Sequence, residues 1–94
     1  MPLVRLVLAS PIAVATRGDR EIEIEFEGTL AALFDHVAER YGREFRARIL
    51  DADGALRRFV NVYVNGEDAR YLQGLETPIR PDATVDLLPA IAGG

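Results

Sequence analysis

The sequence predicts a single α+β domain, because one amphipathic helical pattern stands among segments with the pattern of β-strands. Residues 21–27 alternate acidic and apolar side chains, and residues 30–41 repeat apolar side chains at spacings of three and four. Valines then recur at every second position from Val60 to Val64. A chain of 94 residues, 49% of them hydrophobic, is long enough for one domain with its own core.

Two strands are expected before the helix. Leu3–Leu8 is a short apolar run that ends at Ser10-Pro11, as expected for a buried strand. Glu21–Glu27 places Ile22, Ile24 and Phe26 on one face and glutamates on the other, as expected for a half-exposed strand. The outward glutamates are interpreted as a solvated surface that discourages pairing at an edge, with a docking face as the alternative.

The helix has recognisable ends. The hydroxyl of Thr29 can cap its first amides, and Gly42 can adopt the left-handed conformation that closes a helix. Between them runs one apolar stripe that we interpret as core, made of Leu30, Leu33, Phe34, Val37 and Tyr41. A short second helix is expected within residues 43–56, before a turn at Asp51–Gly54.

The C-terminal half predicts three further strands. Arg58–Val64 has the strongest strand propensity, and Asn65-Gly66 is the preferred pair for a two-residue hairpin turn. Glu67–Tyr71 is expected to return as a short strand. Val85–Leu88 is expected to be the last strand, with Pro89 ending the hydrogen-bonded pairing.

This order of elements, strand-strand-helix-strand-strand-strand, is that of the β-grasp (ubiquitin-like) fold. We therefore expect a mixed sheet of four to five strands packed on one main helix. The predicted division is a β-grasp domain over residues 1–88 and a flexible C-terminal tail over residues 89–94.

The final residues of the tail, Gly93 and Gly94, are the strongest functional signal. Glycine loses more backbone freedom on ordering than any other residue, so two terminal glycines do not serve stability. Because neither has a Cβ, the chain can enter a narrow channel and present only a backbone carboxylate. The carboxylate of Gly94 is the predicted reactive group. The apolar residues before it are predicted to bind a partner: Pro89, Ala90, Ile91 and Ala92.

Composition argues against several other classes of protein. Cysteine is absent, which excludes disulfides, a thiolate metal site, a cysteine nucleophile and a side-chain persulfide. The net charge of −4 argues against nucleic-acid binding and favours a basic protein partner. The apolar N-terminal stretch is interrupted by Arg5 and is too short to span a membrane, so no membrane association and a cytoplasmic location are expected.

No metal site or catalytic side chain is predicted. His36, the single histidine, should face water, and it has no ligand or nucleophile at a suitable spacing. The aspartates of the 51–54 turn lack the further oxygen ligands of a calcium loop. All 11 basic residues are arginine, so no lysine is present to which another copy could be joined; a GC-rich genome explains this composition equally well.

Three segments resemble the ubiquitin-like sulfur carriers of the MoaD and ThiS family: Phe59–Asp68, Gly74–Thr77 and Leu88–Gly94. Within the family, the resemblance is greatest to the carriers that serve cysteine biosynthesis in actinobacteria. It covers nearly the whole chain in element order and the C-terminal third in motif. The chain departs from the family at Arg80–Ala83, where many members have an acidic-Gly-acidic turn.

The resemblance implies a protein that is not an enzyme, binds no cofactor and is used by partner enzymes. An adenylyltransferase of the ubiquitin-activating-like class would join the Gly94 carboxylate to AMP from ATP. Sulfide or an enzyme persulfide would then displace AMP and leave a thiocarboxylate. In the cysteine route, this sulfur would add to an aminoacrylate on a pyridoxal-phosphate-dependent synthase, and a metalloprotease would release the cysteine; a thiolated metabolite is the other destination.

Three alternatives stay open. The chain could modify lysines of other proteins through Gly94, or serve as the small subunit of molybdopterin synthase, or act as a β-grasp adaptor through its sheet alone. The fold does not choose among them, because β-grasp domains serve all of these functions.

A docking face is predicted around Phe59 and Tyr63, with Arg58 and Asp86 as polar flanks. If the valines of this strand point toward the helix, these two rings must point away from it. The competing interpretation is that the rings pack under the 11–19 loop or the 43–56 segment and serve stability.

Overall fold

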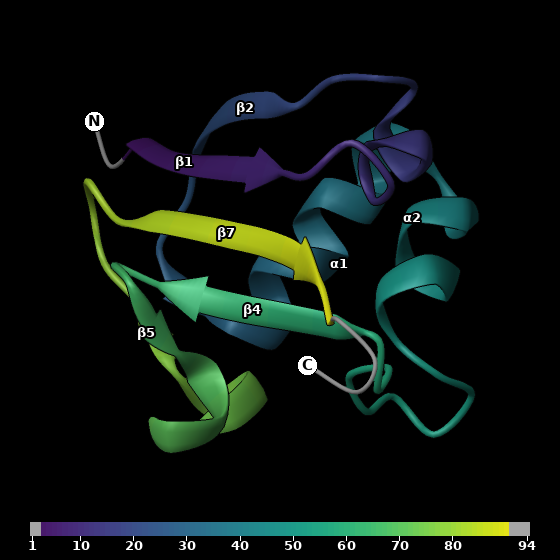
Figure 1. Cartoon of the computed structure of the whole chain (residues 1–94). Coiled ribbons are helices and arrows are strands. Elements are labelled where there is room, and N and C mark those ends of the chain that lie inside the picture. The colour runs from purple at the N-terminus through teal and green to yellow at the C-terminus, as the bar shows by residue number, and fades with distance from the viewer. Residues whose placement is uncertain (1–2, 91–94) are drawn as a thin grey trace.

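The computed structural model describes residues 3–90, which form a sheet covered on one face by helices (Figure 1). The main sheet has five strands: β1 (Leu3–Leu8), β2 (Glu21–Glu25), β4 (Val60–Val64), β5 (Glu67–Asp68) and β7 (Thr84–Pro89). A second, two-stranded sheet pairs β3 (Gly28–Thr29) with β6 (Pro78–Ile79). The helices are α1 (Leu30–Tyr41), α2 (Arg43–Ile49) and the short 3-10 helices η1 (Ala13–Thr16), η2 (Ala69–Tyr71) and η3 (Gly74–Glu76).

The five strands lie in the order β2-β1-β7-β4-β5, so the last strand of the chain occupies the centre of the sheet. β7 runs parallel to β1 and antiparallel to β4, and β1 and β2 form an antiparallel pair. This mixed sheet with α1 against one face is the β-grasp fold, as the order of predicted elements indicated.

The predicted helix is confirmed, and its local sequence explains both ends. Thr29 Oγ1 accepts a hydrogen bond of 3.2 Å from the amide of Ala32, which is the predicted N-terminal cap. Gly42 follows the last residue with the positive φ that favours glycine, +90°, but its ψ of −175° is extended rather than left-handed helical. The physical reason is that α2 begins at the next residue, so the chain must change direction within Gly42.

The core lies between the sheet and the two helices. The apolar stripe of α1 is buried, and Phe34 packs edge-on against Phe45 of α2 with 6.1 Å between ring centroids. From the sheet, Leu6, Val62 and Leu87 are each no more than 2% exposed. Burial of such side chains stabilises a fold by about 2 kcal/mol each.

The hairpin turn at Asn65-Gly66 is also confirmed. Both residues have positive φ values, 50° and 88°, and Val64 pairs with Glu67 across them. The side chain of Asn65 adds a tertiary link, because its Oδ1 accepts a hydrogen bond of 2.9 Å from the amide of Thr84.

Several predicted strand boundaries are wrong. The second strand ends at Glu25 rather than Glu27, and the β4 strand begins at Val60 rather than Arg58. A turn precedes β4, since the amide of Val60 donates to the carbonyl of Arg57 at 3.1 Å. β5 has two residues instead of five, because the Asp68 side chain accepts from the amide of Arg70 and starts η2.

The 11–19 stretch is joined to α1 by a partly buried polar link. Thr16 Oγ1 donates to the carbonyl of Asp19 at 2.6 Å, and the hydroxyl of Tyr41 donates to Asp19 Oδ2 at 2.7 Å. Burial, followed by this hydrogen bond to Asp19, raises the pKa of Tyr41. Among residues 3–90, no helix has the length and apolar composition needed to cross a membrane.

Candidate functional site

The C-terminal segment leaves the molecule from the central strand of the sheet. Pro89 is the last residue of β7 and lies opposite Val60 of β4. The amide of Ala90 then donates a hydrogen bond of 2.8 Å to the carbonyl of Phe59. The exit of the chain is therefore attached to β4, and Ala90 is the last residue that the structure describes.

Pro89 does not end the pairing, contrary to the prediction. In an antiparallel ladder, a bond from Ala90 to Phe59 makes Pro89 and Val60 a non-hydrogen-bonded pair. The nitrogen of Pro89 therefore faces away from β4, toward β1. The register with β1 has already ended at Leu8 and Leu87, so no ladder bond is lost by having a proline there.

Of the six predicted residues of the tail, the structure describes only the first two. Pro89 and Ala90 are half-buried at the end of the sheet. The remaining four lie outside the described residues: Ile91, Ala92, Gly93 and Gly94. Their predicted roles as partner-binding and reactive residues stay predictions.

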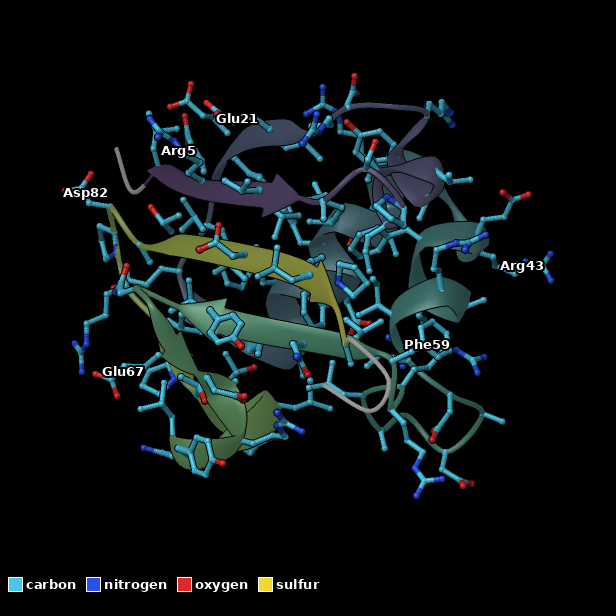
Figure 2. The ribbon with its side chains drawn as sticks, viewed as in Figure 1. Arg5, Glu21, Arg43, Phe59, Glu67 and Asp82 are labelled. Carbon is cyan, nitrogen blue, oxygen red and sulfur yellow. The ribbon has the colours of Figure 1, made fainter. Side chains whose placement is uncertain are left out.

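Phe59 and Tyr63 lie at opposite ends of the β4 region, and their predicted role as one docking face stays a prediction. Phe59 lies in the turn before β4 (Figure 2). Tyr63 lies near the other end of that strand, opposite Asp86 of β7 and Asp68 of β5. Tyr63 is half-buried, and 51% of Phe59 is exposed. The valines of β4 are buried, so the predicted alternation is correct within the strand, and Phe59 lies just before it.

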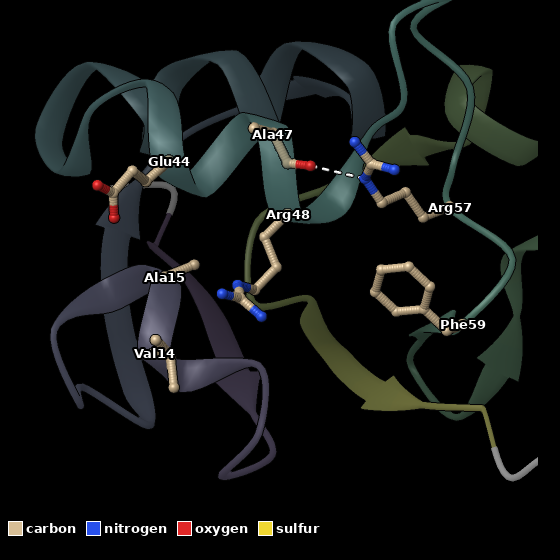
Figure 3. Close-up of a pocket in the computed structure, with 7 residues that line it drawn as sticks. All are labelled: Val14, Ala15, Glu44, Ala47, Arg48, Arg57 and Phe59. Carbon is tan, nitrogen blue, oxygen red and sulfur yellow. Dashed lines mark hydrogen bonds between the residues drawn. The ribbon is translucent and has the colours of Figure 1, made fainter.

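The ring of Phe59 lines a shallow hollow with a volume of about 330 Å³, which we call the Phe59 hollow (Figure 3). Its other lining residues come from η1, from α2 and from the turn before β4: Val14, Ala15, Glu44, Ala47, Arg48 and Arg57. Both segments named in the competing interpretation thus border the ring. They do not cover it, because half of Phe59 is exposed; whether the ring docks a partner stays a prediction.

The open face of the sheet carries apolar and acidic side chains together, and its β2 edge is lined by glutamates. The registers place Val7, Asp86 and Tyr63 in one row across β1, β7 and β4. Leu88 lies on the same face opposite Asn61 and is 38% exposed. Leu88 was not part of the predicted docking face. The alternation of the strand could have placed it there, because Val85 and Leu87 point to the buried face and Leu88 must therefore point to the open one.

The outward acids of β2 include Glu21, whose Oε1 lies 3.7 Å from Nε of Arg5. Both partners of this ion pair are more than half exposed, so it adds little stability and leaves the edge acidic. This agrees with a solvated edge that resists pairing with another strand.

His36 is exposed, and its ring packs 5.7 Å from that of Phe26. Over residues 3–90, no group of three or more histidine, cysteine, aspartate or glutamate side chains is arranged to hold a metal ion.

Comparison with known proteins gives consistent matches over almost the whole chain. The family model described as "ThiS family" matches residues 6–94. A putative sulfur carrier protein of Archaeoglobus fulgidus is 37% identical over 82 residues, which are 87% of this chain and 91% of that protein. The sulfur carrier protein CysO of Mycobacterium tuberculosis is 38% identical over 79 residues, 84% of this chain and 85% of its own.

A solved structure agrees with these sequence matches. A chain of the crystal structure of the Amycolatopsis orientalis BexX/CysO complex superposes with a TM-score of 0.83 at 34% identity. The superposition covers 97% of this chain and 99% of that one.

Proposed function

This chain belongs to the ThiS family of ubiquitin-like sulfur carriers, and we propose that it carries sulfur as a thiocarboxylate on the C-terminal carbon of Gly94. The named relatives are small sulfur carriers rather than catalysts, which supports a role as a protein co-substrate of partner enzymes.

The observation that carries the proposal is the position of β7. The strand that leads to the glycines is held at the centre of the sheet by β1 on one side and β4 on the other, up to Pro89. Four residues beyond Ala90 span about 14 Å when extended, so the sheet presents the terminal carboxylate at a limited distance from a rigid base. This supports delivery of Gly94 into the active site of another enzyme.

The chemistry requires activation, because a carboxylate is a poor electrophile. An adenylyltransferase of the ubiquitin-activating-like class joins the carboxylate to AMP and releases pyrophosphate from ATP. Hydrosulfide then attacks the acyl carbon, the bond to the AMP oxygen breaks, and AMP leaves. Residues 3–90 hold no group of side chains arranged to bind a metal ion, and the partner provides the phosphate-binding and acid-base groups, the bound ATP and the sulfur source.

The identity of the relatives favours cysteine as the destination of the sulfur. Two of the matches reported above carry the name CysO. The proposed acceptor is held by a pyridoxal-phosphate-dependent synthase. After the sulfur adds to it, an acyl shift from sulfur to nitrogen leaves the new cysteine joined to Gly94 by an amide bond, and a metalloprotease hydrolyses that bond and releases the cysteine.

The test is intact mass measurement after incubation with ATP, sulfide and a cognate adenylyltransferase from the same organism. The full chain should exchange one oxygen for one sulfur. Deletion of Gly94 should abolish the exchange and leave the melting temperature unchanged, because a terminal residue beyond the last strand adds little to the core. A truncated chain that still gains the sulfur mass, or a full chain that never gains it, would overturn the proposal.

A further inference from the structure

We infer that the Phe59 hollow binds an acidic segment with one apolar side chain on the adenylyltransferase that receives the tail. This inference rests on the proposed function, because it assigns a second contact to the enzyme that holds Gly94. The contact is separate from the open face of the sheet, since the hollow is bordered by η1 and α2.

The apolar part of the inference comes from exposure. Phe59 is 51% exposed and Val14 is 62% exposed, and both line the same hollow as the small side chains of Ala15 and Ala47 (Figure 3). Exposed apolar side chains on two sides of the hollow can contact one inserted aliphatic or aromatic side chain. Such anchors, once buried, dominate the affinity of protein interfaces.

The charge of the partner follows from two arginines. Arg48 and Arg57 line the hollow, and Figure 3 shows the Arg48 guanidinium between Val14 and Phe59. Arg57 is held in place, because its Nε donates to the carbonyl of Ala47 at 2.6 Å. Within residues 3–90, no carboxylate forms an ion pair with either guanidinium.

The segment that supplies most of the hollow, residues 43–58, also differs in charge from the rest of the molecule. Residues 43–58 contain five arginines and three acidic residues, a net charge of +2, whereas the remainder has six arginines and twelve acidic residues. Glu44 is the single acidic residue that lines the hollow. An acidic segment is therefore attracted to this corner and repelled by most of the surface, which orients the encounter.

The identity of the partner follows from the tail. The amide of Ala90 is bonded to the carbonyl of Phe59, so the tail begins beside the hollow. Because the last four residues span about 14 Å at most, an enzyme that holds Gly94 must approach Ala90 to within that distance. A globular enzyme is wider than about 14 Å, so an enzyme this close to Ala90 also contacts the surface around Phe59.

The first experiment titrates the full chain, labelled with nitrogen-15, with a synthetic peptide of glutamates around one central leucine. Amide shifts should map to Val14, Ala47, Arg48 and Phe59 and should weaken with added salt. A matched peptide with glutamines in place of the glutamates should bind at least ~10-fold more weakly. Shifts elsewhere, or equal binding of both peptides, would overturn the inference.

The second experiment compares Arg48→Glu with the matched control Arg80→Glu in steady-state adenylation. Arg80 is an exposed arginine near the opposite end of β4, beside Val64, and it undergoes the same reversal of charge. Arg48→Glu should raise KM for the carrier by roughly 10-fold at unchanged kcat, whereas Arg80→Glu should resemble the wild type. Equal KM values for the two variants would overturn the inference.

The two proposals fail in different ways. A wild-type chain that never acquires the sulfur mass refutes the proposed function, and the peptide titration still decides whether the hollow binds an acidic segment. A wild-type chain that acquires sulfur while Arg48→Glu keeps a normal KM supports the proposed function and refutes docking at the hollow.

Discussion

The amide of Ala90 donates a 2.8 Å hydrogen bond to the carbonyl of Phe59, which joins the start of the tail to the turn that carries an exposed aromatic ring. The bond comes directly after the last pair of the β4–β7 ladder, Val60 and Pro89. An enzyme that extends the tail therefore meets the Phe59 ring at the point where the tail leaves the sheet.

Phe59→Ala should weaken adenylyltransferase binding by ~2 kcal/mol, a rise of about thirtyfold in Kd, because buried aromatic side chains commonly dominate interfaces. The loss of stability should be small, since half of the ring is exposed in the free protein. Titration calorimetry and thermal unfolding measure the two effects.

The matched control for this variant is Tyr71→Ala, which removes an aromatic ring that is 85% exposed in η2. It should leave Kd unchanged. A lower melting temperature for Phe59→Ala, with unchanged affinity of the remaining folded protein, would show that the ring serves stability instead.

The parts of the fold that depend on neighbouring residues were predictable from the sequence. Thr29 caps α1 through the amide three residues later, and Asn65-Gly66 needs only its own positive φ values to form the hairpin. The period of the apolar stripe in α1 likewise shows which face is buried, whatever that face packs against.

The boundaries that failed depend on distant residues. Pro89 continues its strand because β1 ends at Leu8, more than eighty positions earlier in the chain, and no local pattern records that. The turn before β4 follows from the pairing of the 43–56 segment, where Leu50 bridges Leu56 and Arg57 bonds to the carbonyls of Ile49 and Ala47. For the same reason the sequence supported a position of Phe59 beside the 43–56 segment only as a competing interpretation.

Tyr41→Phe should lower the free energy of unfolding by about 1 kcal/mol at neutral pH. The substitution keeps the ring, which Arg17 and Arg40 flank at 5.5 and 5.4 Å, and removes the hydroxyl that donates to Asp19. Chemical denaturation of the two proteins measures the difference. Tyr71→Phe is the control, because its hydroxyl is on an exposed side chain.

The same bond predicts a loss of stability at alkaline pH. Burial and the Asp19 hydrogen bond raise the pKa of Tyr41 above its ordinary value of 10.0. A raised pKa in the folded state stabilises the fold below pH 10.0 and loses that contribution as the pH rises through the folded pKa. The difference in free energy of unfolding between the wild type and Tyr41→Phe should therefore shrink above that pH. A difference that stays the same would show that the Tyr41 hydroxyl does not stabilise the fold through Asp19.

Asp68→Asn should reduce stability at neutral pH but not in acid. The hydrogen bonds from the Arg70 side chain, and then from its amide, hold the pKa of Asp68 below its ordinary value of 3.8. A lowered pKa stabilises the fold above pH 3.8, and this contribution is lost as the pH falls through the folded pKa. Asparagine keeps one oxygen that can cap η2, but it lacks the second acceptor oxygen, so the variant loses the charge together with one of the two side-chain bonds from Arg70.

Denaturant midpoints of Asp68→Asn and the wild type, measured from pH 7 down to about pH 2, should converge at the acidic end. Asp53→Asn is the control, since the Asp53 side chain is exposed and accepts no hydrogen bond from another side chain in residues 3–90. A difference in denaturant midpoint that stays constant with pH would show that the carboxylate charge of Asp68 adds nothing to the stability of the fold.

Gly93→Val should leave the fold intact and sharply slow adenylation. Position 93 lies three residues beyond the last described residue, so the sheet and its core should unfold at the wild-type temperature. Valine adds a branched Cβ that must enter the channel with the chain, and it restricts the extended conformations available for entry. Gly93→Ala, with an unbranched Cβ, should fall between the wild type and Gly93→Val. The rate of carrier-dependent exchange of pyrophosphate into ATP measures all three, and equal rates would show that the glycines are not there to permit entry.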